Sequence, residues 1–318
     1  MQSMPGSNSD PPDRLQRTRR LRHRYARRMT AERASAEVAQ DVLLGVLYGD
    51  CLGAPYEFTD GTIVGDVSVG RSVFGHPAGR GTDDTETTIA VAQGILDAAR
   101  GDRGVTTAVA ERMLAWYDGR PPDVGGTTAQ GLINFRRSGD PRTGSSAPTS
   151  VANGSLMRSA PYALLNGDGS ELAVDSSRTT HAHQTVLGCV RAYVRMLQLI
   201  ISGDPLDQTM INDLAEVDLE LHPRADPRAI PCAGIGYAPY ALDLAVWSAL
   251  QAEDFHGGLT TIVRLGGDTD TNGAICGAVL AARFGFPETL LADLDQDRVS
   301  EVTRLANALT AVEITQLR

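Results

Sequence analysis

Apolar residues recur at helical spacing along most of the chain after about residue 31. Within the segment 31–53, Val38, Val42 and Val46 fall on one face of a helix. Sustained alternation of apolar and polar residues, which is typical of half-buried strands, is scarce. The pattern therefore predicts an all-α fold rather than alternating strands and helices. Further helices are predicted over residues 84–99, 183–203, 240–253, 273–285 and 297–314.

Two long stretches rich in turn residues, 68–81 and 136–155, interrupt this helical pattern. Glycine, proline and serine punctuate both of them, so we expect loops there. Loops of this length often carry functional residues. The chain shows no internal repeat. We therefore expect one compact domain over residues 31–318. Residues 1–30 form an Arg-rich segment that we expect to be a disordered tail.

Charge is distributed unevenly along the 318 residues, whose net charge is −10. The first 28 residues hold eight arginines against two aspartates, so they contribute +6 and the remainder about −16. The strong negative charge of the remainder disfavours binding to the phosphate backbone of nucleic acids, so no nucleic-acid partner is expected. The tail alone leaves open a nucleic-acid or membrane arm. All 29 basic residues are arginine, which excludes a Schiff-base lysine and a P-loop lysine.

Neither membrane insertion nor secretion is indicated by the sequence. No apolar run approaches the ~20 residues that span a bilayer, and no apolar stretch follows the basic segment. We therefore expect a cytoplasmic protein without a membrane partner. The cysteines lie far apart and form no C-x-x-C pair, so reduced thiols are expected at Cys51, Cys189, Cys232 and Cys276.

The stretch "GTDDTETT" (81–88) puts Thr82, Asp83 and Asp84 at the start of a predicted helix that should be buried. One interpretation is helix capping, because threonine and aspartate cap helices well and acids in the first turn complement the helix dipole. The residues themselves do not exclude this interpretation.

A second acidic cluster favours another interpretation. Asp268, Asp270 and Thr271 again precede a predicted buried helix, and an extended turn would let both carboxylates face one point. Four carboxylates brought together would repel one another by on the order of 4 kcal/mol for each pair at ~4 Å, unless cations lie among them. Oxygen ligands without histidine or cysteine favour Mg²⁺, Mn²⁺ or Ca²⁺.

Two other acidic motifs share part of "DTDTNG" (268–273). An EF-hand loop would need a glutamate where Val279 stands, so an EF-hand is rejected. The D-x-D-x-T motif of haloacid-dehalogenase-like phosphatases follows a strand near the N-terminus of a parallel α/β fold. Here the motif follows two glycines late in a helical chain.

Six motifs in order resemble the ADP-ribosylglycohydrolase family. They are "GVLYGDCLGAPYEF" (45–58), "GTDDTETT" (81–88), "NGSLMRSAP" (153–161), "TTHAHQTVLGCVRAY" (179–193), "GYAPYALDLAVW" (236–247) and "GGDTDTNGAICGAVLAARFG" (266–285). The resemblance implies a single compact orthogonal helical domain. It also implies a hydrolase that cleaves the N- or O-glycosidic bond between ADP-ribose and an acceptor. The acceptor would be a protein side chain, such as arginine or serine, or a small molecule.

The resemblance also implies a site. It would hold two Mg²⁺ or Mn²⁺ ions, with ligands Thr82, Asp83, Asp84, Asp268, Asp270 and Thr271. Glu57 matches a mobile-loop carboxylate that acts as acid or base, and the catalytic set would be Glu57, Asp83, Asp84 and Asp270. The substrate would be bound by Gly79, Gly81, Asn153, Gly154, Ser155, His181, Tyr237 and Gly267.

The chain departs from the family pattern at Ser150, Gln184 and Tyr240. Members that cleave arginine-linked ADP-ribose often carry an aspartate where Ser150 stands, so the acceptor stays open. An alternative function is an ADP-ribose or nucleotide-sugar binding protein with little turnover. A third, an immunity protein that blocks a toxin by contact, has no motif in its favour.

Overall fold

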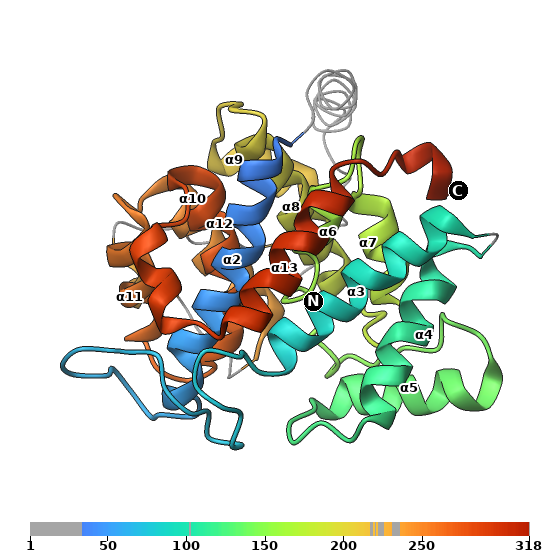
Figure 1. Cartoon of the computed structure of the whole chain (residues 1–318), viewed down its shortest axis with the longest axis horizontal. Coiled ribbons are helices and arrows are strands. Elements are labelled where there is room, and N and C mark those ends of the chain that lie inside the picture. The colour runs from blue at the N-terminus through green and yellow to red at the C-terminus, as the bar shows by residue number, and fades with distance from the viewer. Residues whose placement is uncertain are drawn as a thin grey trace, which may run out of the picture.

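The computed structural model describes residues 34–101, 103–216, 219, 221, 226–230 and 236–317. The Arg-rich segment and Cys232 lie outside these residues. The fold is all-α, as predicted (Figure 1). The only β-structure among the described residues is a few isolated β-bridges in the loops. The α-helices are α2 (Ala36–Gly53), α3 (Asp83–Arg100), α4 (Val105–Asp118), α5 (Gly126–Ser138), α6 (Ala160–Ala163), α7 (Ser170–Ser177), α8 (Gln184–Ile201), α9 (Gln208–Ala215), α10 (Ala238–Leu250), α11 (Phe255–Val263), α12 (Thr269–Phe284) and α13 (Gln296–Leu309).

Short 3₁₀ helices connect several of these elements. They are η1 (Ala54–Tyr56), η2 (Pro227–Ala229), η3 (Glu288–Asp293) and η4 (Ile314–Leu317). Within the described part of the chain, no helix is both long and apolar enough to cross a bilayer. Three cysteines, Cys51, Cys189 and Cys276, are buried and carry free thiols.

Helix boundaries differ from the predicted ones where capping decides them. The first helix begins only at Ala36, because the Ser35 side chain accepts a hydrogen bond from the Val38 N–H and caps it. The helix predicted from residue 273 begins earlier, at Thr269. Asp270 and Thr271 therefore lie in the first helical turn, and only Asp268 keeps the non-helical conformation expected of an extended turn.

Helices α2 and α12 pack with their backbones in contact. A Cβ atom added to Gly49 would lie 2.0 Å from the carbonyl oxygen of Gly273, and one added to Gly45 would lie 2.3 Å from that of Gly277. Side chains at these positions would force the helices apart, so glycine is required. Because the two helices run antiparallel, the end of α2 lies beside the start of α12.

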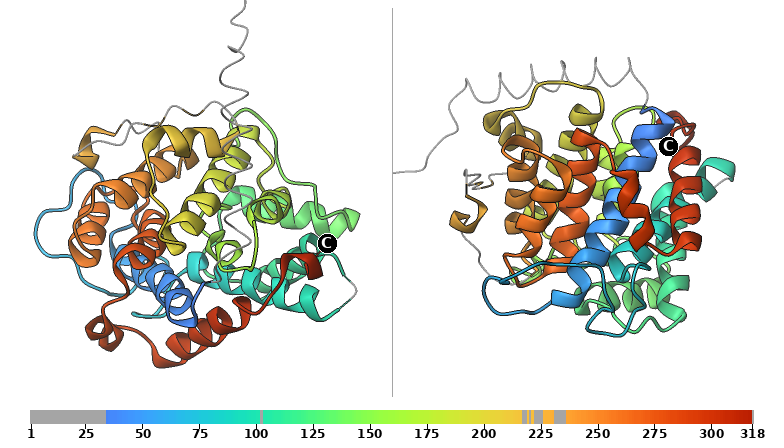
Figure 2. Two further views of the ribbon diagram at one scale, coloured as in Figure 1. Left: turned by 90° about the horizontal axis from the view of Figure 1, so that it is seen from above. Right: turned by 60° about the vertical axis from the view of Figure 1, so that its left-hand side comes forward.

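Helix α2 runs through the middle of the molecule, with α12 on one side and α13 on the other (Figure 1, Figure 2). Helix α3 packs against α4 and α13, and α8 contacts α7, α10 and α12. One large cluster of buried apolar side chains joins these helices. This core fixes the end of α2 and the starts of α3 and α12 relative to one another.

Candidate active site

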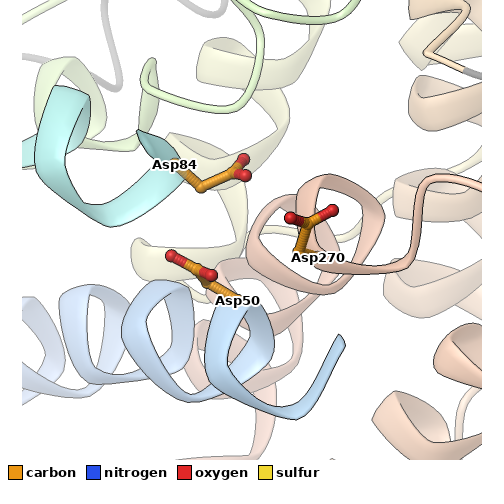
Figure 3. A group of neighbouring side chains, drawn as sticks. All are labelled: Asp50, Asp84 and Asp270. Atoms are coloured by element: carbon orange, nitrogen blue, oxygen red, sulfur yellow. The ribbon is translucent and has the colours of Figure 1, made fainter. Parts of the chain in front are cut away.

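The two predicted acidic segments meet at the ends of three helices. The Thr271 hydroxyl at the start of α12 lies 3.3 Å from Asp84 Oδ2 at the start of α3. Figure 3 shows the carboxylates of Asp84, Asp270 and Asp50 pointing into a common space between α3, α12 and α2. Segments about 185 residues apart in the sequence therefore share one polar centre. The carboxylates there are close enough to repel one another when they are ionised.

Helix capping also occurs at the first segment, as the alternative interpretation expected. Thr82 is the N-cap of α3, and its hydroxyl accepts a hydrogen bond of 3.4 Å from the Asp84 N–H. The Asp84 carboxylate, however, does not cap its own helix. Its Oδ2 accepts hydrogen bonds from the hydroxyls of Thr82 and Thr271, so capping accounts for the threonine and not for the carboxylate.

Asp50, near the end of α2, is a central residue that the sequence analysis missed. Its side chain is fully buried. Oδ2 accepts hydrogen bonds from the Thr82 N–H at 2.8 Å, the Thr85 N–H at 3.0 Å and the Thr85 hydroxyl at 2.6 Å. The acid thus satisfies donors at the N-terminus of α3, where negative charge is favourable. It ties α2 to α3 through one oxygen atom.

Two groups of carboxylates have oxygen atoms close enough to share a cation. Within each group the oxygens lie within 4.8 Å of one another: Asp50 with Asp84 and Asp270, and Glu57 with Asp268 and Asp270. Asp270 belongs to both groups, so the two positions are adjacent. Asp83 is buried at the same centre, as the first residue of α3.

Burial and mutual repulsion oppose ionisation of these carboxyl groups. Both raise the pKa of Asp83, Asp84 and Asp270 well above the usual range. Burial likewise raises the pKa of Asp50, and it raises that of Glu57 to about 8 with the help of nearby acids. It is therefore energetically unfavourable for all of these carboxyl groups to be ionised when no cation lies among them.

A divalent cation fits this centre on two observations. Asp50 Oδ1 and Asp84 Oδ1 are buried, and neither accepts a hydrogen bond from the described residues. Buried polar atoms almost always have partners, so two unpartnered oxygens on carboxylates that point into one space indicate a place for positive charge. The atoms that could bind the cation are carboxylate and hydroxyl oxygens, which suit a hard cation.

A cleft of about 300 Å³ opens beside the acidic centre. Of the predicted residues it is lined by Glu57, Asp83, Asn153, Gly154, His181, Asp268, Asp270 and Thr271. The Asn153 amide donates a hydrogen bond of 2.7 Å to Asp268 Oδ2. The Asn-Gly loop is therefore attached directly to the acidic centre.

Other predicted substrate-binding residues are near the cleft without lining it. The Ser155 hydroxyl is buried and accepts a hydrogen bond from Ser177. Gly79 packs against residues 293–295, and Gly81 leaves room for the side chains of Thr85 and Asp50. Tyr237 and Gly267 act through their backbones in isolated β-bridges, to Ala152 and Thr59 respectively. Direct substrate contact by these five residues remains a prediction, and the structure supplies a packing or backbone reason for each.

Glu57 is held over the centre by the backbone that follows it. The Phe58 N–H donates to the Gly267 carbonyl at 2.7 Å, and the Gly267 N–H donates to the Thr59 carbonyl at 2.9 Å. Phe58 adopts a φ of 61°, which non-glycine residues rarely adopt. The pairing with Gly267 thus fixes a strained turn that places Glu57 within reach of Asp270 and Asp268.

Part of the cleft wall was not predicted from the sequence. It includes Asp123, the start of α5 at Gly125 and Gly126, and the aromatic pair Phe58 and Phe74. The two rings lie edge to face with centroids 5.9 Å apart, and both are about half exposed. The "DVGG" sequence before α5 was the available signal, because an acid followed by glycines at a helix start exposes backbone N–H groups.

Known proteins resemble this chain over most of its length. The family model described as ADP-ribosylglycohydrolase matches residues 30–317. The chain is 29% identical over 292 residues to an ADP-ribosyl-[dinitrogen reductase] glycohydrolase of Rhodospirillum rubrum, covering 86% of this chain and 96% of that one. It is 27% identical to the ADP-ribosylarginine hydrolase Tri1 of Pseudomonas putida, covering 81% and 73% respectively.

A solved structure named as an ADP-ribosylglycohydrolase-related protein complex has the same fold. It superposes with a TM-score of 0.71 at 30% identity and covers 86% of this chain and 97% of that one. Family model, relatives and fold therefore agree with one another and with the motifs in the sequence. The chain belongs to the ADP-ribosylglycohydrolase family, whose members are hydrolases of ADP-ribosyl linkages.

Proposed function

We propose that this enzyme is a divalent-metal-dependent hydrolase of ADP-ribose attached to arginine. One observation carries the proposal. The acidic segments 82–84 and 268–271 converge beside a cleft that also contains Glu57. This arrangement puts cation-binding oxygens and an acid–base group on one wall of the same cleft.

In this proposal the acidic centre holds two Mg²⁺ or Mn²⁺ ions. The holding residues would be Thr82, Asp83, Asp84, Asp268, Asp270 and Thr271, with Asp50 added because its Oδ1 has no hydrogen-bond partner among the described residues. When bound, such ions supply positive charge that orients ribose hydroxyl groups and favours attack by water.

The bond that breaks joins the anomeric ribose carbon to the acceptor nitrogen. Water supplies the new oxygen on that carbon, and the nitrogen takes up a proton as it leaves. Departure of the nitrogen builds oxocarbenium character on the ribose. Glu57, half-buried at the cleft, is placed to take the proton from water or to give one to the nitrogen.

Three uncharged features of the cleft would hold the ADP-ribose portion. They are the Asn153 amide, the backbone at Gly154 and the His181 ring, all on the cleft wall. Amide, backbone and imidazole groups match the many oxygen atoms of ribose and diphosphate. The start of α5, with glycines at its first turn, adds N–H donors suited to an anion.

The cleft mouth favours a cationic acceptor such as a guanidinium. Phe58 and Phe74 offer exposed ring surfaces, and Asp123 adds a carboxylate beside them. Aromatic faces and carboxylates both attract guanidinium groups. No arginine is among the described residues that line the cleft. Ser150 bears little on the choice, because its hydroxyl pairs with that of Ser145 and it does not line the cleft. The curated relative Tri1 is named an ADP-ribosylarginine hydrolase.

Release of ADP-ribose from defined peptides tests the proposal. Arginine-linked and serine-linked ADP-ribosyl peptides would be incubated with metal-stripped enzyme, then with Mg²⁺ or Mn²⁺ restored. We expect metal-dependent release that is faster from arginine. Glu57→Gln should lower kcat by about 10²- to 10⁴-fold, whereas Glu288→Gln, an exposed glutamate outside the cleft, should not.

The same assay separates the alternatives. Undiminished release in EDTA would contradict the metal requirement, and preference for serine would contradict the acceptor assignment. Tight ADP-ribose binding by calorimetry without release from any peptide would favour the binding-protein alternative over hydrolysis.

A further inference from the structure

Arg158 is a buried guanidinium that forms no ion pair with the described residues. Its side chain lies just after the Asn-Gly loop and is 4% exposed. Within the described part of the chain, no carboxylate lies within 4 Å of it to form an ion pair. It donates instead to the Gly154 carbonyl oxygen and, at 2.6 Å, to the Thr180 hydroxyl. Burying a charge this way is costly, so a specific role for its hydrogen bonds is expected.

Thr180 passes this interaction on to His181. Its fully buried hydroxyl lies 2.8 Å from His181 Nδ1. The oxygen accepts from Arg158, and Nδ1 is the acceptor within reach of the hydroxyl proton among the described residues, so donation to Nδ1 lets this buried proton find a partner. Donation to Nδ1 requires that Nδ1 carry no proton, so the proton of the neutral ring resides on Nε2.

The Nε2 edge of the ring lies beside Gly154 in the cleft wall. His181 lines the cleft, and its ring lies against Gly154, where a Cβ would meet Nε2 at 3.3 Å and Cε1 at 3.2 Å. Nε2 makes no hydrogen bond to the described residues. Glycine at 154 thus lets the ring approach the loop, and it leaves Nε2 available to a bound molecule.

The charge of Arg158 also keeps the ring neutral. Burial, together with this neighbouring cation, lowers the pKa of His181 to about 3. A histidine in this setting is an uncharged hydrogen-bond donor at neutral pH and does not serve as a general acid or base.

We propose that Arg158 and Thr180 are positioning residues that fix His181 as a neutral ring with its proton on Nε2, which donates to an oxygen atom of the ligand. The identity of that oxygen, on the diphosphate or the ribose, rests on the proposed function. The fixed tautomer does not. The chain has no lysine, and no arginine lines the cleft among the described residues, so uncharged side chains are the donors available there to recognise oxygen.

Nitrogen NMR of the imidazole tests the tautomer without any turnover. In ¹⁵N-labelled full-length protein, the His181 signals are assigned by their loss in His181→Gln. Between about pH 5 and 8, the range in which an ordinary histidine titrates, we expect Nε2 to keep the shift of a protonated nitrogen and Nδ1 that of an unprotonated one. A ring protonated on Nδ1, or on both nitrogens, would overturn the proposal.

Matched variants test the positioning role. Thr180→Ser keeps the hydroxyl and should retain both the tautomer and the ADP-ribose affinity. Thr180→Val removes the hydroxyl, so a mixture of tautomers and about three- to tenfold weaker ADP-ribose binding are expected. An unchanged tautomer in Thr180→Val would overturn the role of Thr180.

The remaining outcomes separate this proposal from the proposed function. Should Thr180→Val not fold, Arg158→Lys takes its place, because lysine keeps the charge and cannot make both hydrogen bonds. In Arg158→Lys the tautomer of His181 must then change for the proposal to stand. A fixed tautomer in a protein that binds no ADP-ribose would support the positioning role and contradict the proposed function. A changed tautomer with unchanged ADP-ribose affinity would overturn the donation to the ligand.

Discussion

At the scale of single residues, Asp50 shows how one carboxylate serves two purposes. Oδ2 accepts three hydrogen bonds from Thr82 and Thr85 and so joins α2 to α3. Oδ1 is buried and accepts no hydrogen bond from the described residues. In the proposed function, the structural and cation-binding roles are therefore carried by different atoms of the same side chain.

Asp50→Asn should separate these roles. The amide oxygen can keep the contacts of Oδ2, while the NH₂ group takes the place of Oδ1 and repels a cation. We expect a folded protein with at least about tenfold weaker Mn²⁺ binding, measured by titration calorimetry, because one charged ligand is lost. Thr85→Val, which removes one hydrogen bond to Oδ2 and no ligand, should weaken Mn²⁺ binding less. Equal affinities for wild type and Asp50→Asn would exclude Asp50 as a ligand.

His181 should make folding sensitive to acid. Its pKa is lowered to about 3 in the folded protein, against the ordinary histidine value of 6.5, so below pH 6.5 the unfolded chain binds a proton that the folded one does not. Its contribution is complete above pH 6.5 and is lost as the pH falls toward 3. Denaturant unfolding of wild type and His181→Gln should give a stability difference whose slope approaches about 1.4 kcal/mol per pH unit. A difference constant from pH 7 to 4 would contradict a buried neutral ring.

Phe74 should affect the acceptor more than ADP-ribose. Its ring and that of Phe58 stand at the cleft mouth. Phe74→Ala removes a contact worth about 0.5–1 kcal/mol for a guanidinium at an exposed site. We expect KM for an arginine-linked peptide to rise about two- to fivefold, with inhibition by free ADP-ribose unchanged. Phe284→Ala, at an exposed phenylalanine outside the cleft, is the control. Equal effects on peptide and ADP-ribose would contradict an acceptor role.

At the scale of helices, the contact between α2 and α12 determines the geometry of the acidic centre. Asp50 lies one residue beyond Gly49, and Asp270 lies three residues before Gly273. The two glycines meet directly, so their helices carry these carboxylates to the same place. Cation binding is thereby coupled to packing in the core.

Gly49→Ala should break this coupling. A Cβ there would lie 2.0 Å from the Gly273 carbonyl oxygen, so the helices must separate. We expect a loss of about 2 kcal/mol or more of unfolding free energy, as for overpacked cores, together with weaker Mn²⁺ binding. Gly104→Ala is the matched control, since a Cβ at Gly104 meets nothing within 4 Å. If Gly49→Ala had the stability and Mn²⁺ affinity of that control, the close contact would not be required.

At the scale of the whole molecule, the sequence predicted those features that depend on residues close together in the chain. Helical periodicity predicted the all-α fold, and the resemblance of the acidic motifs to a known family implied that segments 82–84 and 268–271 share one site. Asp50 was missed because it lies in an apolar helix, where nothing marks it until α3 packs on it. Asp123 and the contact of Arg158 with Thr180 depend likewise on tertiary neighbours. The first turn of α12 was misplaced because glycines and acids before a helix resemble a loop.

The central claim is that the starts of α3 and α12 share divalent ions with the end of α2. Anomalous diffraction from a crystal soaked in Mn²⁺ tests it most directly. The account predicts two anomalous peaks among the carboxylates of Asp50, Asp84, Asp268 and Asp270, both absent in Asp84→Asn/Asp270→Asn. Ions bound only elsewhere, or no peak between these helix ends at saturating Mn²⁺, would contradict it.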